Sequence, residues 1–275
     1  MPLAWALNFD AELELEAGPR YAPPERVLRA MEEPRARLRR ALGAGDVVLD
    51  LDAEERARGL EGRCWCPTPR ALARLARAGA VVPEAPDASV IARANERGFA
   101  FAIGHLEGAR RCTREAEVLE ALARNRRSVV KRGLGFAGRG QRRIDAPSEA
   151  DRAWIRAALR SGALYVEPRV DIELEVALHG LVHRDGTVER GAPTIQRVER
   201  GAWRESRLAA AGELAARELA ELHDAFDRAA RALVAIGYFG PFGIDAYRHA
   251  GGFCALGEIN ARYTMGWGTG MGGWR

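Results

Sequence analysis

The sequence predicts a mixed α+β protein whose second half is built on antiparallel sheet. Strand-like runs fill residues 164–198, where Asp185-Gly186 is typical of a two-residue hairpin turn. Apolar residues then recur at spacings of three and four from Leu208 to Ile236, as they do on the buried face of a long helix. A last pair of strands flanks Ala250-Gly251. Strands and helices that occur in separate runs favour α+β over a parallel α/β architecture.

The individual elements follow from local patterns of apolar residues, caps and turns. Before residue 163 we expect strands at Trp5–Phe9, Val47–Asp52, Phe99–Gly104 and Ser128–Arg132, and a further one within residues 141–147. The helices expected there are Glu25–Leu42, one capped by Thr68 with Pro69 in its first turn and Gly79 at its end, one from Thr113 to Arg124, and one capped by Ser148 and ending at Arg160. The later strands are Leu164–Val170, Glu173–His183, Thr187–Arg190, Thr194–Val198, Phe242–Tyr247 and Cys254–Asn260.

Composition excludes several classes of protein. With 275 residues, 47% of them hydrophobic, the chain can bury a core as one unit of two or three sub-domains. No run approaches the roughly 18 apolar residues of a membrane span, and the first ten residues lack the features of a signal peptide. Cys64 and Cys66 form the only close cysteine pair, which argues against a zinc site or a disulfide framework. We therefore expect a cytoplasmic protein without a membrane partner.

The net charge of +4 raises the alternative of nucleic-acid binding. The basic residues are spread among 38 acidic ones, and few aromatic residues lie between them. That pattern is typical of a solvated surface, so we expect no nucleic-acid partner, and this alternative ranks last among the functions considered.

Lysine is almost absent from this chain. Of the 42 Lys and Arg residues only Lys131 is a lysine, so arginine supplies nearly every other positive charge. A position that keeps lysine against this bias indicates a need for a compact ammonium group instead of a planar guanidinium. Chance survival of one lysine is the alternative, and the sequence that follows Lys131 argues against it.

A glycine-rich segment begins two residues after Lys131. Its glycines are Gly133, Gly135, Gly138 and Gly140. Successive glycine N–H groups can cradle phosphate oxygens, and a neighbouring lysine adds a point charge. The G-x-G-x-x-G spacing also fits a dinucleotide fingerprint, but that motif needs a helix directly after the loop, and residues 141–147 read as a strand and a turn. We therefore interpret the segment as a phosphate-binding flap between two antiparallel strands.

The strand from Tyr165 to Val170 leads into a second strand with alternating acids. A sheet with one solvent-exposed face would produce this pattern even if the acids had no functional role. The functional interpretation places the backbone of Glu167 to Val170 against an adenine edge and the Glu173 carboxylate on ribose hydroxyls. Pro168 favours an edge or a connection between sub-domains, because proline cannot donate to a central ladder.

The last predicted hairpin carries a set of hard oxygen ligands. Glu258 and Asn260 are two residues apart on one strand and so face the same way. A two-residue turn at Ala250-Gly251 would place Asp245 opposite Leu256 and diagonal to Glu258. Two carboxylates and an amide oxygen suit Mg²⁺ held jointly with phosphate, and Arg262 follows close enough to meet a phosphoryl or carboxylate group. An ordinary charged hairpin is the alternative.

Taken together, these motifs resemble the ATP-grasp superfamily over roughly residues 68 to 266. In that family a strand lysine precedes a glycine-rich flap, which looks like Lys131 and its glycines. A late Asp followed by Glu-x-Asn, in several members Glu-x-Asn-x-Arg, is similar to Asp245 and Glu258-Ile-Asn-Ala-Arg262. The resemblance implies two α+β sub-domains whose antiparallel sheets grip ATP, here within residues 67–275 and divided at 165/166. A short N-terminal α/β sub-domain, residues 1–66, would precede them.

The chain departs from the family pattern in three places. We find no second lysine upstream of Lys131, and Arg93, Arg110 and Arg111 are the candidate replacements. The N-terminal part is short for the family. The chain also ends 15 residues after Asn260 in a glycine-rich tail, where family members usually continue.

The resemblance further implies an ATP- and Mg²⁺-dependent ligase that activates a carboxylate as an acyl phosphate and joins it to an amine. Lys131 and Arg262 would be the catalytic cations, and Arg197 is a candidate substrate contact. The expected partners are small carboxylates and amines such as amino acids or peptides, and a homodimer is left open. A small-molecule kinase on the same scaffold and a non-catalytic nucleotide-binding protein are the alternatives.

Overall fold

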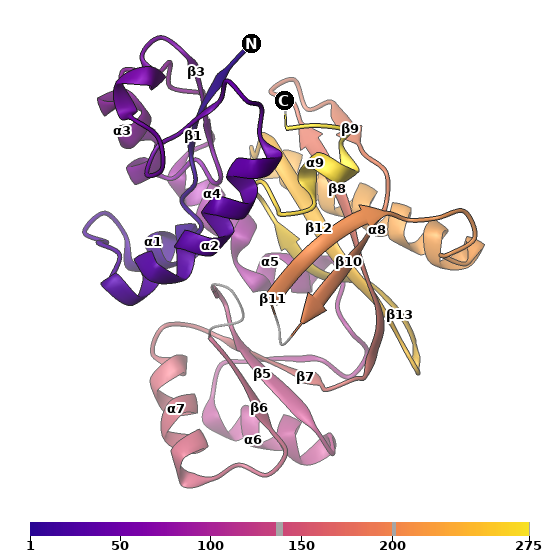
Figure 1. Ribbon diagram of the computed structural model, residues 1–275. Coiled ribbons are helices and arrows are strands. Elements are labelled where there is room, and N and C mark those ends of the chain that lie inside the picture. Colours follow the sequence, from indigo (N-terminus) through magenta and orange to yellow (C-terminus); the bar gives the residue numbers. More distant parts are fainter. Residues whose placement is uncertain (136–139, 200–201, 275) are drawn as a thin grey trace.

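The computed structural model describes residues 1–135, 140–199 and 202–274 and contains three separate sheets. The first sheet is parallel, in the order β2-β1-β3, and lies at the N-terminal end of the molecule (Figure 1). Its strands are β1 (Leu3–Ala6), β2 (Val47–Val48) and β3 (Glu61–Cys64). The helices around it are α1 (Ala11–Ala17), α2 (Glu25–Ala41), the short 3₁₀ helix Glu54–Ala57 and α3 (Pro69–Arg77).

The second sheet has four strands in the order β4-β7-β5-β6, and all of its pairings are antiparallel. Its strands are β4 (Arg110–Cys112), β5 (Ser128–Arg132), β6 (Gln141–Ile144) and β7 (Leu164–Pro168). The helices α6 (Glu115–Arg124) and α7 (Glu149–Leu159) cover one face, where Val118, Leu122 and Ile155 pack against Val130 and Val166. We call this sheet the flap sheet, because Lys131 lies in its strand β5 and the glycine segment follows β5 in the sequence and precedes β6.

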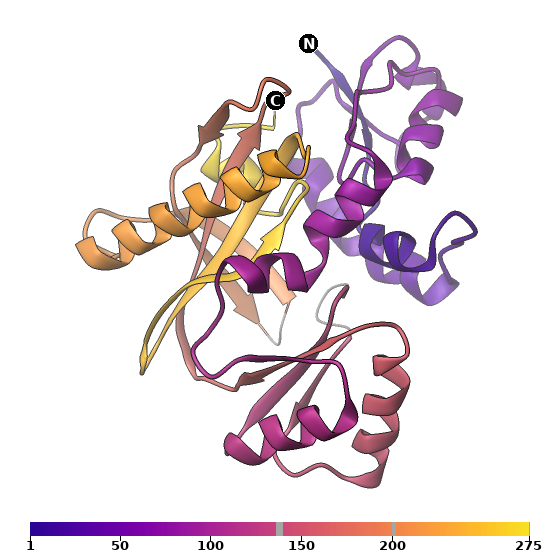
Figure 2. The ribbon, with the colours of Figure 1, turned by 180° about the vertical axis from the view of Figure 1, so that it is seen from behind.

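The third sheet has six strands, with the main path β11-β10-β8-β12-β13 and β9 paired to β8. Its strands are β8 (Ile172–Val182), β9 (Val188–Arg190), β10 (Thr194–Glu199), β11 (Ala202–Leu208), β12 (Gly240–His249) and β13 (Gly252–Asn260). Helix α8 (Ala216–Ala235) lies across one face of this sheet (Figure 2). Leu222, Phe226 and Leu233 of α8 are fully buried against β8 and β12, which explains the helical stripe in the sequence.

Two predicted strands are too long, since β1 ends at Ala6 and β2 at Val48, and two further local predictions are wrong. Residues 202–208 form strand β11, so the helix begins at Ala216 and not at the start of the apolar stripe. Phe99–Gly104, predicted as a strand, belongs to helix α5 (Arg97–Ile103), which follows α4 (Ala88–Asn95). A five-residue apolar run such as 99–103 cannot be assigned by periodicity alone, and here it packs on β13 and α8 as a helix.

A shared core joins the N-terminal part to the end of the chain. Trp5 and Trp65 are buried together with Tyr263 and Trp267, and the Trp5 and Tyr263 rings meet edge to face at 5.2 Å. The last helix, α9 (Trp267–Gly270), lies in this junction, and Trp274 packs on Trp5 at 6.2 Å. The two ends of the described chain therefore lie side by side (Figure 1).

No helix among the described residues is both long enough and apolar enough to cross a bilayer.

Candidate active site

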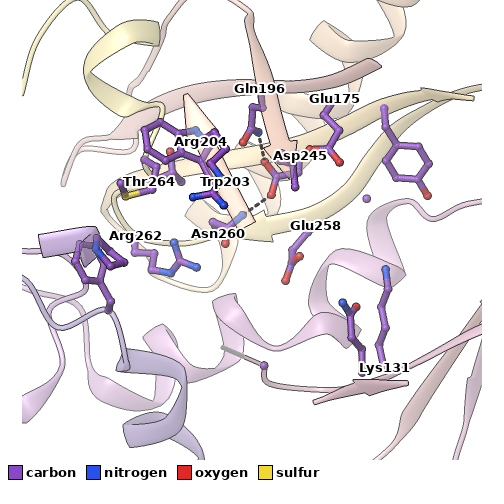
Figure 3. A pocket seen from close by; sticks show the side chains of 18 of the residues that line it. Lys131, Glu175, Gln196, Trp203, Arg204, Asp245, Glu258, Asn260, Arg262 and Thr264 are labelled. Carbon is purple, nitrogen blue, oxygen red and sulfur yellow. Dashed lines mark hydrogen bonds between the residues drawn. The ribbon is translucent and has the colours of Figure 1, made fainter. Parts of the chain in front are cut away.

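A cavity of about 520 Å³ lies between the flap sheet, the six-stranded sheet and the N-terminal part. Lys131 lines it from β5, Asp245 from β12, and Glu258 and Asn260 from β13. Arg262 lines the same cavity just beyond β13, so that in Figure 3 Glu258 lies between Arg262 and Lys131. Lys131 is separated from Asp245 by 114 residues in the sequence, yet both line one cavity of the size that small ligands occupy.

The hairpin that carries the acids has the predicted turn but not the predicted register. His249 pairs with Gly252, so Ala250-Gly251 is the turn, and the pairing runs regularly to Tyr247 and Cys254. The register then shifts, and Asp245 pairs directly with Glu258 instead of Leu256. Three residues of β13 oppose one residue of β12 here, which is a β-bulge with two extra residues. The bulge brings the two carboxylates closer than the predicted diagonal arrangement.

Asp245 is held by two amides. Gln196 donates from Nε2 to its Oδ1 at 3.0 Å, and Asn260 donates from Nδ2 to its Oδ2 at 2.9 Å. Burial, and then the charge of Glu258, raise the pKa of Asp245 to about 6. Burial also acts to raise the pKa of Glu258, but Arg97, Lys131 and Arg262 outweigh it and leave that pKa below its ordinary value. Cations thus favour the ionised form of Glu258, whereas the partners of Asp245 among the described residues are the amides of Gln196 and Asn260.

This donor set fits a hard divalent cation that is shared with a phosphate. The Asn260 amide oxygen remains available when its nitrogen bonds Asp245, and the Glu258 side chain is 43% exposed toward the cavity. No group of three His, Cys, Asp or Glu side chains in the described part of the chain could hold a metal alone. Two carboxylates and one amide are too few ligands for an all-protein Mg²⁺ cage, but they suit Mg²⁺ that also binds phosphate oxygens.

Lys131 is paired across the flap sheet. Its Nζ lies 2.5 Å from Oε2 of Glu167, which sits on the neighbouring strand β7 diagonal to it. Both side chains are largely buried, at 20% and 13% exposed. The pair fixes the ammonium group at the cavity wall, while Glu167 itself does not line the cavity.

Arg97 is a site residue that the sequence interpretation missed. It lines the cavity from the start of α5, and its Nη2 donates to Glu258 at 3.1 Å. Its backbone N–H donates to the Gly133 carbonyl at 2.8 Å, which ties α5 to the start of the glycine segment. Arg97 Nη1 is buried without a hydrogen-bond partner among the described residues. The three arginines named as replacements for a second lysine, Arg93, Arg110 and Arg111, are exposed and do not line the cavity.

Two of the four flap glycines line the cavity. Gly135 and Gly140 do so, and Gly140 has φ +85°, a conformation that side chains with Cβ rarely adopt. Gly133 contributes its carbonyl to the bond with Arg97 and is not a lining residue. Gly138 lies outside the described residues.

Besides Glu167 and Gly133, three further predicted contacts do not line the cavity. The β8–β12 register shifts at Glu173, which is left without a paired residue on β12. This bulge leaves the Glu173 side chain exposed, and Ile172 and Glu175 line the cavity instead. Arg197 is exposed and pairs with Glu199 and Glu205, because strand alternation directs its neighbours Gln196 and Val198 inward. Val170 is half-buried beyond the end of β7 and is also not a lining residue.

Arg262 is fixed from the N-terminal part of the chain. Its Nε lies 2.5 Å from Oε1 of Glu12 on α1, and its guanidinium carbon lies 5.8 Å from the centre of the Trp65 ring. Glu12 is buried at 5% exposure. The cavity therefore has an anchored cation at each end, with Asp245, Glu258 and Asn260 between them (Figure 3).

Comparison with protein families gives one match that covers more than half of the chain. Residues 110–265 match the family model described as an ATP-grasp domain. A search of curated proteins finds no relative that matches significantly.

Solved structures with the same fold cover nearly the whole chain. D-alanine–D-alanine ligase from Bacillus anthracis is 11% identical, with a TM-score of 0.57 over 98% of this chain and 90% of that one. D-cycloserine synthetase DcsG is 14% identical, with a TM-score of 0.54 over 98% and 95%. N5-carboxyaminoimidazole synthetase from Staphylococcus aureus, complexed with ADP, is 11% identical, with a TM-score of 0.55 over 96% and 71%. At these identities the similarity shows a shared fold.

Proposed function

The chain belongs to the ATP-grasp family, and from this premise we propose that it is an ATP- and Mg²⁺-dependent ligase that activates a carboxylate as an acyl phosphate and couples it to an amine. The observation that carries the proposal is the convergence of Lys131, Asp245, Glu258, Asn260 and Arg262 on one cavity. The names of the three similar structures support the class, since all are ligases or synthetases.

The Lys131 side of the cavity would bind the nucleotide. Lys131 and Arg97 offer two cations whose charges both act on Glu258, and the backbone around Gly135 and Gly140 can approach phosphate oxygens closely. Arg97 would then take the role for which the sequence offered no second lysine. Its buried Nη1 has no partner among the described residues, and a phosphate oxygen would satisfy it.

Asp245, Glu258 and Asn260 would hold Mg²⁺ with the phosphates of ATP. The ion would neutralise charge that accumulates on the transferring phosphoryl group. The contribution of the chain is to hold these three oxygen donors in place, with Gln196 and Asn260 fixing both oxygens of Asp245.

The Arg262 side would bind the acid substrate. The substrate carboxylate attacks the γ-phosphate of ATP and releases ADP, and an amine then attacks the acyl phosphate and expels phosphate. Phosphoryl transfer of this kind depends on positioning and charge neutralisation, which a rigid guanidinium provides. Phe9, Trp65 and Met265 line the same end of the cavity and would exclude water from the reacting groups.

The decisive experiment measures ADP release from Mg-ATP with a panel of amino acids and small carboxylic acids, followed by mass spectrometry of the products. A new amide that forms with ADP supports the ligase. A stable phosphorylated product without an amide would identify the kinase alternative. ATP binding without turnover across the whole panel would favour a non-catalytic nucleotide-binding protein.

The single lysine allows a second test that needs no substrate. Reductive methylation modifies amines, and this chain offers only Lys131 and the N-terminal amine of the exposed Met1. Mg-ATP should slow methylation of Lys131 while the N-terminal amine reacts at an unchanged rate as an internal control. Equal rates at Lys131 with and without Mg-ATP would remove it from the nucleotide site.

A further inference from the structure

The short segment that carries Arg262 is tied to the N-terminal third of the chain from three sides. Asn95 on α4 bonds both backbone groups of Ala261, accepting from its N–H at 2.9 Å and donating to its carbonyl at 3.2 Å. The Tyr263 N–H donates to the Trp65 carbonyl at 3.0 Å. The Arg262 side chain between these ties is bonded to Glu12 on α1.

The bonds of the guanidinium leave one nitrogen for the cavity. Nε donates to Glu12 at 2.5 Å and Nη1 donates to the Tyr263 carbonyl at 3.1 Å. Nη2 has no hydrogen bond to any described residue, and Arg262 lines the cavity. Since the five guanidinium hydrogens have a fixed geometry, fixing Nε and Nη1 also fixes the direction of Nη2. The Trp65 ring, 5.8 Å from the guanidinium carbon, limits motion on one face.

Among the described residues, Glu12 has no hydrogen-bond or ion-pair partner other than Arg262. Its Oε2 is buried without a hydrogen bond to the described residues, so the Arg262 contact is the interaction that compensates this carboxylate. A buried carboxylate is costly unless it is paired, and 250 residues separate these two partners in the sequence. Glu12 does not line the cavity itself and so reaches it only through Arg262.

We propose that Glu12 is a positioning residue that aims Arg262 at the transferring phosphoryl group, and that the N-terminal sub-domain thereby completes the active site. This inference rests on the proposed function of Arg262. It gives the N-terminal part a definite task in catalysis, beyond its contribution to the core. Without the Glu12 carboxylate only the Tyr263 carbonyl and the Trp65 ring constrain the guanidinium, and misplacement of about 1 Å can cost up to 100-fold in rate.

Helix α1 offers a matched control. Glu14 is buried to the same extent as Glu12, but it bonds Thr68 and Arg70 and does not line the cavity. We expect Glu12→Gln to lower kcat about tenfold or more while KM for ATP changes less than about threefold. Glu14→Gln should stay within about threefold of wild type in both parameters. Equal losses in the two variants would mean that Glu12 only stabilises the fold.

A double-mutant cycle separates positioning from a general structural effect. In an Arg262→Gln background, Glu12→Gln should cause no further loss of kcat, because its effect passes through Arg262. Multiplicative losses would overturn the inference. The same cycle measured by urea unfolding needs no activity: coupled effects on the unfolding midpoint are expected, and additive ones would show that the pair does not form.

Wild-type turnover in the same assay separates a test of the ligase proposal from a test of the positioning role of Glu12. A wild type that releases no ADP with any substrate pair defeats the ligase proposal, and the unfolding cycle still decides whether Glu12 fixes Arg262. An active wild type with a fully active Glu12→Gln variant defeats the positioning role alone.

Discussion

The two ends of the cavity hold their cations in similar ways but depend on different parts of the chain. Lys131 lies 2.5 Å from Glu167, and Arg262 lies 2.5 Å from Glu12, with all four side chains at most 20% exposed. The first pair spans 36 residues and joins adjacent strands of one sheet. The second spans 250 residues and joins the last segment of the chain to its first helix.

This difference determines when each end of the site can form. The Lys131 pair exists as soon as β5 and β7 align in the flap sheet. The Arg262 pair requires the N-terminal part to dock on the end of the chain through Trp5, Trp65, Tyr263 and Trp267. The Lys131–Glu167 pair is thus a property of one sheet, whereas the Arg262–Glu12 pair is a property of the assembled molecule.

The largest effect is expected from the residues between the two ends. Asp245→Ala or Glu258→Ala should lower ATP turnover on the order of 1,000-fold, about 4 kcal/mol, because each removes charge stabilisation that both ends share. ADP release measures this loss. Asp227→Ala, which removes an exposed acid on α8, should leave turnover unchanged. Undiminished ADP release in the Asp245 and Glu258 variants would defeat the metal assignment, provided that circular dichroism shows a native fold.

A swap of cation at the nucleotide end comes next. Lys131→Arg keeps the charge but replaces a compact ammonium group with a larger planar fork beside Glu167, so kcat/KM for ATP should fall about 100-fold, or about 2.7 kcal/mol. Steady-state kinetics with varied ATP would show a raised KM. The reverse swap at an exposed position, Arg217→Lys, is the control and should have no effect. Normal activity of Lys131→Arg would show that position 131 does not require a compact ammonium group.

The corresponding swap at the other end should affect a different kinetic parameter. Arg262→Lys cannot bond Glu12 and the Tyr263 carbonyl and still present a nitrogen to the cavity, so kcat should fall about 50-fold, or about 2.3 kcal/mol. KM for ATP should change less than about threefold. If Lys131→Arg and Arg262→Lys alter the same parameter equally, the division of the cavity into a nucleotide end and an acid end is wrong.

The smallest effect concerns the pH dependence of the free energy of unfolding. His179 on β8 is 1% exposed beside the Trp267 ring, and burial lowers its pKa to about 4. His179 therefore binds a proton near pH 6.5 in the unfolded chain but only near pH 4 in the folded chain. Stability is consequently lost as pH falls from 6.5 toward 4. At pH 5 the loss should be about 2 kcal/mol relative to pH 8. Urea unfolding at both pH values measures it.

A His179→Leu variant provides the control for this pH effect. Its stability should fall less than that of wild type between pH 8 and pH 5, by about the same 2 kcal/mol. Identical pH dependence in the two proteins would show that His179 is not the responsible group.

Features that depend on neighbouring residues were predictable from the sequence. Strand β5 begins at Ser128 and ends at Arg132 as expected, and Ser148 caps α7 with a reciprocal bond to Asp151. The Ala250-Gly251 turn was also correct, as was the ATP-grasp family. Each of these follows from local chemistry or from the order of short motifs along the chain.

Features that depend on distant contacts were not predictable. Arg97 was missed because residues 99–104 read as a strand, and only the packing of α5 on β13 brings its guanidinium to Glu258. The Glu12–Arg262 pair has no local signal at either residue. The register between Asp245 and Glu258 depends on a bulge that a count from the turn cannot detect. The division of the chain at residues 66/67 and 165/166 and the assignment of magnesium remain predictions.

The bulge in β13 also separates the tip of the hairpin from its two acidic residues. Between Tyr247 and the turn the two strands pair residue for residue, while Asp245 and Glu258 are aligned beyond the extra residues, where β12 is also held by β8. Because Leu256 is buried in the core and β12 is paired to β8 up to His249, an insertion at the exposed Ala250-Gly251 turn lengthens the tip without moving the carboxylates. Peptide tags or grafted loops could accordingly be placed at this tip, and removal of the two surplus residues would instead pull Glu258 away from Asp245.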